Sequence, residues 1–310
     1  MTTLSTLAFV FPGQGSQKQG MLAELAMAYP VVQETFAEAS DVLGYDLWQL
    51  SQEGPQEALN MTERTQPLLL AASVAIWRVW QQEKVEQPAL MAGHSLGEWS
   101  ALVCAGVVAF ADAIRLVQLR GKYMQEAVPS GVGTMAAIIG LDDQIIIDAC
   151  KEAQEGEDVS AVNFNSPGQV VIAGHVGAVD RAIALCKEKG AKKAMTLAVS
   201  APFHSALLKP AADRLALEIA QVSFSSPNIP VVHNVNAQTE NSPEEIKQRM
   251  IEQIYHPVLW VDCVNTLAKA GVSQVVECGP GKVLSGLIKR IDRSITSVAA
   301  DTPAAFLSES

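Results

Sequence analysis

A serine between two glycines, directly after a short apolar run, is the feature that most restricts how this chain can fold. Residues 93–97 read Gly-His-Ser-Leu-Gly and follow the run Ala89-Leu-Met-Ala92. This G-x-S-x-G pattern is typical of a sharp turn from a buried strand into a helix, which lifts the serine hydroxyl above the sheet. The glycines leave space where side chains would clash with the turn. Ser95 is therefore a candidate nucleophile, although a serine here could also serve only as a helix cap.

Apolar strands alternate with helical stretches on both sides of this turn. Of the 310 residues, 49% are hydrophobic, which is enough for a large core. Alternating strands and helices imply a mainly parallel sheet with both faces covered. The predicted strands are Leu7–Phe11, Ala89–Ala92, Ile229–Asn234 and Val275–Cys278. The predicted helices are one ending near Tyr29, then Thr65–Gln82, Leu96–Val107, Asp112–Val128, Leu207–Gln221, Ser242–Tyr255 and Val283–Arg290.

The middle of the chain has a different pattern, with strands and helices in the order β-α-β-β-α-β. This order is typical of a ferredoxin-like arrangement. We therefore expect a small domain at residues 129–200, inserted between two parts of the large domain at 1–128 and 201–310. Residues 301–310 are expected to be loose. The six predicted elements are Thr134–Ile139, Asp142–Glu155, Val159–Phe164, Gln169–Gly174, Gly177–Lys189 and Ala194–Ser200.

Composition excludes several classes of function. The formal net charge is −11 without a long basic run, which argues against a nucleic-acid partner. The five cysteines contain no C-x-x-C pair, so we expect free thiols in a reducing cytoplasm and no zinc site. The longest uncharged apolar stretches, Thr65–Trp77 and Trp99–Ala111, are shorter than the ~20 residues of a membrane helix. With no signal-like N-terminus, the chain is expected to be soluble and cytoplasmic.

A glycine turn at residues 12–16 follows the first predicted strand. It lacks the third glycine of a dinucleotide-binding loop, because Lys18 holds that place. Met21 follows Gly20 where a phosphate-binding loop would carry lysine. The turn is therefore predicted to serve something other than a phosphate.

A serine nucleophile needs a base, and His204 is the leading candidate among five histidines. It lies where the chain re-enters the large domain, and clefts form at such junctions. His94 adjoins the serine but is expected to point away across the turn. Asp213 and Asp262 are possible carboxylates for a triad, and the stretch 253–260 offers an amide or a backbone carbonyl instead.

Arg120 is a further candidate, one helix after the serine. Its surroundings alone favour a surface arginine, because arginines are seldom buried unpaired.

Taken together, several motifs resemble the malonyl-CoA:acyl carrier protein transacylases of bacterial fatty acid synthesis. The resemblance covers about residues 7–290. The ordered set is specific, although each piece alone is weak. In order they are Phe11-Pro-Gly-Gln-Gly-Ser-Gln17, Thr65-Gln-Pro67, Gly93-His-Ser-Leu-Gly-Glu98, Gln118-Leu-Arg-Gly121, Asn163-Phe-Asn-Ser-Pro-Gly-Gln-Val-Val-Ile-Ala-Gly174, Ala201-Pro-Phe-His204 and Glu277-Cys-Gly-Pro-Gly281.

The resemblance implies a large α/β hydrolase-like domain with a ferredoxin-like insert. It implies ping-pong transfer of malonyl from malonyl-CoA to the phosphopantetheine thiol of acyl carrier protein, with no bound cofactor or metal and a monomeric enzyme. The resemblance implies that Ser95 is the nucleophile, that His204 is the base and that Gln253 orients this base. It also implies that the N–H groups of Gln14 and Leu96 form the oxyanion hole and that Arg120 binds the malonyl carboxylate.

Three further expectations concern specificity and docking. Phe203 is expected to limit the size of a substituent at the α-carbon of the acyl group. The resemblance predicts a tyrosine at position 99, and the tryptophan found there is expected to affect only the fine shape of the pocket. Carrier protein is expected to dock on a basic patch, although a solvated face is the more common role of such lysines. The candidate cations are Lys187, Lys189, Lys192, Lys193, Lys282, Lys289 and Arg290.

Three alternatives remain open at this point. A serine hydrolase or thioesterase shares the turn, but it would normally carry a triad carboxylate between Ser95 and His204, and it has no use for Arg120. A non-enzymatic module that binds carrier protein is a second alternative. An acyltransferase serving a polyketide synthase is the third, because the same malonyl transfer feeds both pathways.

Overall fold

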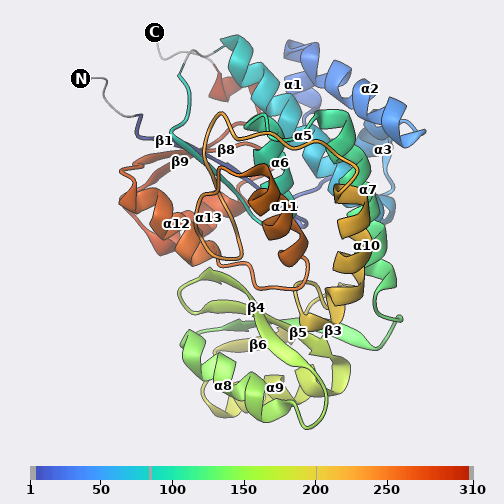
Figure 1. Cartoon of the computed structure of the whole chain (residues 1–310). Helices are drawn as coiled ribbons and strands as arrows, with labels where there is room; N and C mark the ends of the chain where they lie inside the picture. Colours follow the sequence, from blue (N-terminus) through green and yellow to red (C-terminus); the bar gives the residue numbers. More distant parts are fainter. Residues whose placement is uncertain (1–4, 84–85, 200, 307–310) are drawn as a thin grey trace.

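Two separate β-sheets, each covered by helices, make up the computed structural model, which describes residues 5–83, 86–199 and 201–306 (Figure 1). One sheet is parallel and lies in the upper part of the view. Its strands are β1 (Leu7–Phe11), β2 (Leu90–Gly93), β7 (Val231–Val232), β8 (Gln274–Glu277) and β9 (Thr296–Ala299), in the order β7-β2-β1-β8-β9. The other sheet is antiparallel. Its strands are β3 (Gly133–Ile139), β4 (Val159–Ser166), β5 (Gln169–His175) and β6 (Lys193–Thr196), in the order β4-β5-β3-β6.

Helices account for most of the remaining described chain. Before the antiparallel sheet they are α1 (Ala23–Ala28), α2 (Val31–Leu43), α3 (Leu47–Glu53), α4 (Gln56–Leu59), α5 (Thr62–Glu83), α6 (Leu96–Cys104) and α7 (Phe110–Glu126). Within and after it they are α8 (Asp143–Ala153), α9 (Val176–Glu188), α10 (Lys209–Ile219), α11 (Pro243–Glu252), α12 (Trp260–Lys269) and α13 (Val283–Ile291), with single 3₁₀ turns η1 (Ala206–Leu208) and η2 (Pro303–Ala305). No helix within these described ranges is both long and apolar enough to cross a bilayer.

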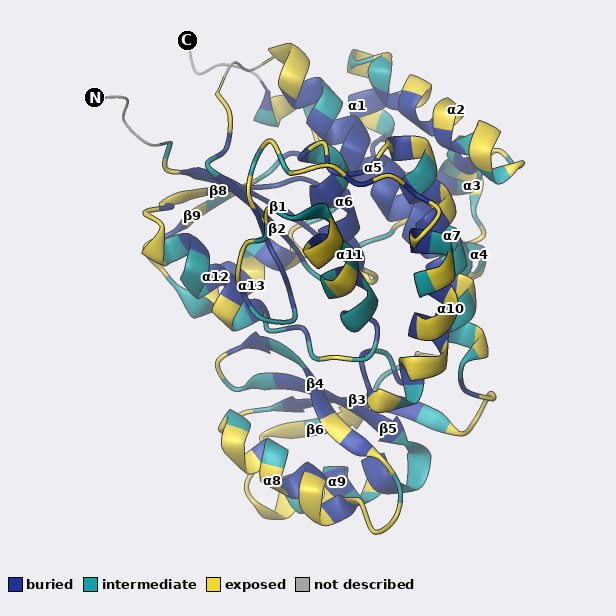
Figure 2. Cartoon of the chain, in the orientation of Figure 1, coloured by how far each residue is buried: buried dark blue, intermediate teal, exposed yellow. Residues whose placement is uncertain are grey.

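The strands β7, β2, β1 and β8 of the parallel sheet are buried on both faces apart from Gln274, as their apolar sequences predict, while the edge strand β9 is partly exposed. Alternate side chains of β1 enter different cores. Phe9 and Phe11 join the core built with α5 and α6, where Phe9 makes edge contacts to Trp77 and Trp80 at 5.2 and 4.9 Å between ring centroids. Ala8 lies on the other face with α12 and α13. Figure 2 shows β1 and β2 as buried, while the edge strand β9 and the outward faces of α2 and α10 include exposed residues.

The antiparallel sheet packs α8 and α9 against one face and turns its other face toward the parallel sheet (Figure 1). Val162 and Val171 lie on that second face and are packed with Phe203. The two sheets are joined by main-chain hydrogen bonds, because Phe164 N donates to Val258 O at 3.0 Å and Val258 N donates to Val162 O at 2.8 Å. A side-chain bond adds to this link: His94 Nε2 lies 2.8 Å from Asn165 Oδ1.

Most of the predicted elements are confirmed, with boundary shifts of a few residues. The predicted strand Ala194–Ser200 is too long, because β6 ends at Thr196, and Ser200 lies outside the described residues. The expectation of a loose C-terminus is wrong as far as residue 306. Phe306 is buried and packs on Tyr29 and Trp80. The sequence analysis did not identify α2, α3, α4, α12 and β9.

The elbow between β2 and α6 depends on close backbone contacts that only glycine permits. A Cβ atom at Gly97 would lie 1.9 Å from the carbonyl oxygen of Phe11, and one at Gly93 would lie 2.0 Å from the carbonyl carbon of Gly97. Both distances are far below van der Waals contact. The turn therefore brings the start of α6 directly onto the end of β1.

Replacing Gly97 by alanine is predicted to lower the free energy of unfolding by roughly 3 kcal/mol or more, because backbone must move to admit the methyl group. Gly286 is the matched control, since a Cβ atom there meets nothing within 4 Å and the residue lies within α13. Gly286→Ala should leave stability unchanged or raise it by about 1 kcal/mol. Urea titrations of both variants measure the difference. Equal unfolding midpoints would contradict the packing argument.

Candidate functional site

Ser95 lies at the point where the chain turns from β2 into α6. Its backbone has φ 53° and ψ −110°, a conformation that costs energy for a residue with a side chain and often marks a functional site. The side-chain amide of Asn234 holds the turn through two hydrogen bonds. Ser95 N donates to Asn234 Oδ1 at 2.8 Å, and Asn234 Nδ2 donates to the carbonyl oxygen of Gly93 at 2.7 Å. The strain is therefore supported by neighbours, and the Ser95 hydroxyl remains available for other contacts.

His204 faces that hydroxyl. Its Nε2 lies 2.7 Å from Ser95 Oγ, and its Nδ1 lies 2.7 Å from the main-chain oxygen of Gln253. A carbonyl oxygen only accepts, so Nδ1 carries the proton and Nε2 presents a lone pair to the serine. The carboxylates weighed in the sequence do not take this place. Asp213 pairs with Lys209 on an exposed part of α10, and Asp262 is exposed on α12.

Burial controls the protonation of His204. The side chain is 3% exposed, and burial, together with the nearby positive charge of Arg120, lowers the pKa of His204 to about 3. The imidazole is therefore neutral near pH 7 and able to accept a proton at Nε2. An anion bound to Arg120 would offset that positive charge and make His204 a stronger base.

Arg120 is buried beside this pair and is only 1% exposed. The surface position that its sequence surroundings favour is therefore wrong, while the spacing Val117, Arg120, Met124 along α7 does place it on the buried face. Its NH1 donates to Gln66 Oε1 at 2.7 Å. Its NH2 donates to Ser95 Oγ at 3.3 Å and to Gln253 Oε1 at 3.0 Å.

The Arg120 guanidinium also keeps unused hydrogen-bonding capacity. Its Nε is buried and has no partner among the described residues. No carboxylate of these residues lies within 4.0 Å of its guanidinium nitrogens. A buried cation in this state is suited to an anionic group brought in by a ligand.

A cavity of about 690 Å³ opens beside these groups, between the two sheets. Ser95 and His204 line it, together with Gln14 and Phe203. Gln14 stands on the turn after β1, and Ser95 follows β2; these strands are hydrogen-bonded neighbours, so their carboxyl ends meet. Leu96 is the first residue of α6, where main-chain N–H groups are free of intrahelical bonds. The glycine turn and the elbow therefore border one cavity.

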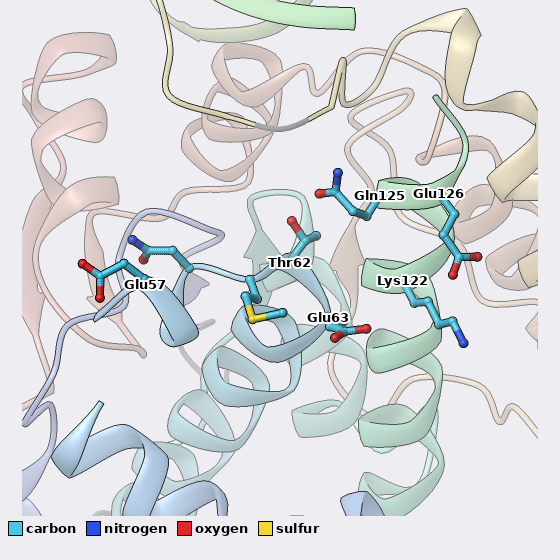
Figure 3. Close-up of a pocket in the computed structure, with 8 residues that line it drawn as sticks. Glu57, Thr62, Glu63, Lys122, Gln125 and Glu126 are labelled. Atoms are coloured by element: carbon cyan, nitrogen blue, oxygen red, sulfur yellow. The ribbon is translucent and has the colours of Figure 1, made fainter. Parts of the chain in front are cut away.

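A smaller cavity of about 370 Å³ lies alongside and shares Asn60 and Thr62 with the first. Figure 3 shows Lys122, Gln125 and Glu126 on α7 at one side of it, with Glu57 on the other side. Its wall contains carboxylates and one lysine but no paired serine and histidine. No group of three or more metal-ligating side chains occurs anywhere in the described chain. The serine–histidine pair therefore lies at the larger of these two cavities.

The structure also identifies buried polar residues to which the sequence analysis assigned no role. Gln66 bridges Arg120 and Gln14, since its Nε2 donates to Gln14 Oε1 at 3.2 Å. Glu98 is fully buried and lies 2.6 Å from both His233 Nδ1 and Gln253 Nε2. Lone polar residues inside apolar helices were the available signal for Gln66 and Glu98.

The unexpected Trp99 is fully buried in the core. It makes an edge contact with Phe224 at 6.3 Å and is not part of the cavity wall. The substitution therefore acts on packing behind the elbow.

Comparisons with known proteins agree with this geometry. The model of the acyl transferase domain family matches residues 8–304. The malonyl CoA-acyl carrier protein transacylase of Salmonella typhimurium is 61% identical over 303 residues, which cover 98% of each chain. The crystal structure of an acyl carrier protein S-malonyltransferase from Vibrio cholerae is 61% identical with a TM-score of 0.96, covering 97% of this chain and 98% of that one.

A third relative was solved with a partner. It is a malonyl-transacylase in complex with its type II PKS acyl-carrier protein. It is 59% identical with a TM-score of 0.96, and the match covers 97% of this chain and 98% of that one. With a family model spanning nearly the whole sequence and relatives of this identity, the chain belongs to the acyl transferase family.

Proposed function

We propose that the chain is an acyl carrier protein S-malonyltransferase, which moves malonyl from malonyl-CoA to the phosphopantetheine thiol of acyl carrier protein in fatty acid biosynthesis. The names of the relatives at about 60% identity support the activity and the substrate. The observation that carries the proposal is a serine–histidine pair beside a buried guanidinium with an unpaired nitrogen. The pair suits acyl transfer, and the guanidinium suits an acyl group that ends in a carboxylate.

In the proposed mechanism His204 acts twice as acid and base. Its Nε2 takes the Ser95 proton as Oγ attacks the thioester carbon of malonyl-CoA. Collapse of the tetrahedral intermediate breaks the C–S bond, and Nε2 returns the proton to the departing CoA thiolate. The phosphopantetheine thiol then gives its proton to Nε2 and attacks the malonyl ester. The ester C–O bond breaks, and Ser95 leaves with the proton.

The remaining site residues stabilise charge in this scheme. We assign the oxyanion hole to the N–H groups of Gln14 and Leu96, a type of contact worth about 3 kcal/mol per donor. Gln253 orients His204 through its main-chain oxygen, 2.7 Å from Nδ1. Arg120 clamps the malonyl carboxylate, and an acetyl group would leave this buried cation unpaired. Phe203 lines the same cavity and would crowd a branched acyl group.

Several finer assignments belong to the same proposal. The strand order β4-β5-β3-β6 supports a ferredoxin-like small domain, and the elbow after β2 supports a hydrolase-like large domain. Several expectations stay predictions. They are the domain boundaries 1–128, 129–200 and 201–310, the monomeric state, the cytoplasmic location, and the absence of a cofactor and of a nucleic-acid partner. A hydrolase is disfavoured because the His204 Nδ1 partner is a carbonyl and Arg120 has no hydrolytic use.

Incubation with radiolabelled malonyl-CoA is predicted to label Ser95, and added holo carrier protein should remove the label. Arg120→Ala should slow malonyl labelling about 100-fold or more, because the carboxylate loses its buried partner. Arg115 is the control on the same helix, since it is exposed and pairs with Asp112. Arg115→Ala should react normally. Quenching in acid and peptide mass analysis locate the label, and rapid release of free malonate would instead indicate a hydrolase.

His204 is predicted to stay neutral from pH 8 to pH 5, and Arg120→Met should raise its pKa because a neighbouring positive charge is lost. The pKa of His204 in the folded state is about 3, below its ordinary value of 6.5, so between these pH values the folded state binds fewer protons than the unfolded state. The free energy of unfolding therefore falls as the pH drops from 6.5 toward 3. Ring-proton NMR, assigned with His204→Gln, follows the titration. A wild-type midpoint near 6.5 would contradict this electrostatic account.

Docking of the carrier protein is predicted to use the basic surface at the end of α9 and the start of β6. Lys189 and Lys193 are exposed there, although Lys189 also lies 3.4 Å from Glu152. Reversing both charges should raise the KM for carrier protein about three- to tenfold and leave the KM for malonyl-CoA unchanged. Steady-state kinetics with each substrate varied separately test this. An unchanged KM for carrier protein would remove these lysines from the docking surface.

A further inference from the structure

Glu98 is a fully buried carboxylate one helical turn after Ser95. It accepts from three N–H donors: His233 Nδ1 at 2.6 Å, Gln253 Nε2 at 2.6 Å and Asn234 N at 3.1 Å. It touches neither the cavity nor the Ser95 hydroxyl, so the transfer mechanism does not use it directly. A buried ionised group of this kind is costly unless it is fully hydrogen-bonded, and Glu98 meets that condition.

The Gln253 side chain connects Glu98 to Arg120. Its Nε2 is surrounded by oxygens, since it donates to Glu98 Oε2 and to Ser95 O at 2.6 and 3.0 Å. Its Oε1 accepts from Arg120 NH2 at 3.0 Å. If the amide were reversed, its NH2 would face the guanidinium and its oxygen would face Glu98. Glu98 therefore determines which end of this amide meets Arg120.

Charge is the second link between the two residues. Burial lowers the pKa of Arg120 to about 10, and the negative charge of Glu98 opposes that shift. A carboxylate in direct contact would neutralise Arg120 equally well, but it would occupy the nitrogens that a substrate carboxylate needs. Glu98 acts from one amide further away, and Arg120 Nε remains unpaired.

We propose that Glu98 is a positioning residue for acyl selection: through the Gln253 amide it supplies the counter-charge of Arg120 while it leaves the guanidinium open to the carboxylate of the acyl group. The inference rests on the proposed function, because it takes Arg120 as the malonyl clamp. It adds to that function a residue that touches neither the substrate nor the reacting atoms.

Glu98→Gln, which keeps the shape and removes the charge, tests the inference. The rate constants for acylation of Ser95 by malonyl-CoA and by acetyl-CoA are measured in single turnovers by intact-protein mass. The ratio of malonyl to acetyl rates is expected to fall about tenfold or more, toward the ratio of Arg120→Ala. In an Arg120→Ala background the same change should leave the ratio unaltered, because the two residues act together.

Glu277 provides the matched control. It is also fully buried, and it accepts from Leu284 N, Ser285 N and Ser285 Oγ at 2.7–2.9 Å at the start of α13, outside the site. Glu277→Gln should lower the unfolding temperature without moving the malonyl-to-acetyl ratio. Glu98→Asp, which keeps the charge, should restore part of the ratio lost in Glu98→Gln.

A ratio in Glu98→Gln equal to that of wild type, with only stability lowered, would overturn the inference. If Glu98→Gln does not fold, Gln253→Met replaces it, because it removes the amide and retains the main-chain oxygen bound to His204. An unchanged ratio in Gln253→Met would overturn the inference equally. Failure of the proposed function looks different: wild type would not acquire malonyl on Ser95, or Arg120→Ala would leave the ratio unchanged.

Discussion

A guanidinium buried without a carboxylate partner is the constraint around which the rest of this site is arranged. Arg120 is 1% exposed, and its hydrogen-bond acceptors are the neutral oxygens of Gln66, Gln253 and Ser95. Burying a cation in this way is unfavourable until an anion arrives. Hydrogen bonds hold both amides in place: Gln253 Nε2 donates to Glu98, and Gln66 Nε2 donates to Gln14 Oε1.

The same arrangement explains how one glutamine serves two functions. The main-chain oxygen of Gln253 holds Nδ1 of His204, and its side-chain oxygen holds NH2 of Arg120. A conventional triad carboxylate could do the first but would place a negative charge near the second. A neutral carbonyl fixes the tautomer of His204 and adds no negative charge beside Arg120. Under the proposed function, the use of a carbonyl at His204 Nδ1, where the described residues place no acidic side chain, suits a site that recognises a substrate carboxylate.

Local features of the chain were predictable from sequence because they depend on neighbours along the chain. The elbow at Ser95 needs only the glycines at 93 and 97 and the apolar strand before them, and the structure has that turn. The succession of strands and helices along residues 133–196 and the strands β1, β2, β7 and β8 also follow local hydrophobic patterns, whereas β9 was not identified. The position of His204, where the chain returns from the antiparallel sheet to the part that contains the parallel sheet, could be predicted for the same reason.

Contacts between segments that lie far apart in the sequence could not be predicted from such local patterns. Glu98 is separated by more than 130 positions from His233, Asn234 and Gln253, and no local pattern indicates which carboxylate a buried amide will meet. The burial of Arg120 is an intermediate case. Its spacing from Val117 and Met124 indicates the buried face of α7, but the general rarity of buried arginines outweighed that pattern. Helices α2 to α4 were not identified, although the spacing of Val32, Phe36 and Ala39 along α2 is typical of an amphipathic helix.

The main-chain bonds between β4 and Val258 have a mechanical consequence. Val258 belongs to the short segment that runs from Gln253, which holds His204, to Trp260 at the start of α12. Because both neighbours of Asn163 in β4 exchange hydrogen bonds with Val258, the antiparallel sheet is tied to the segment that orients the imidazole. Tilting of the small sheet would therefore strain this tether. A group that widened the cleft between the sheets would therefore pull, through Val258, on the segment whose main-chain oxygen bonds His204 Nδ1.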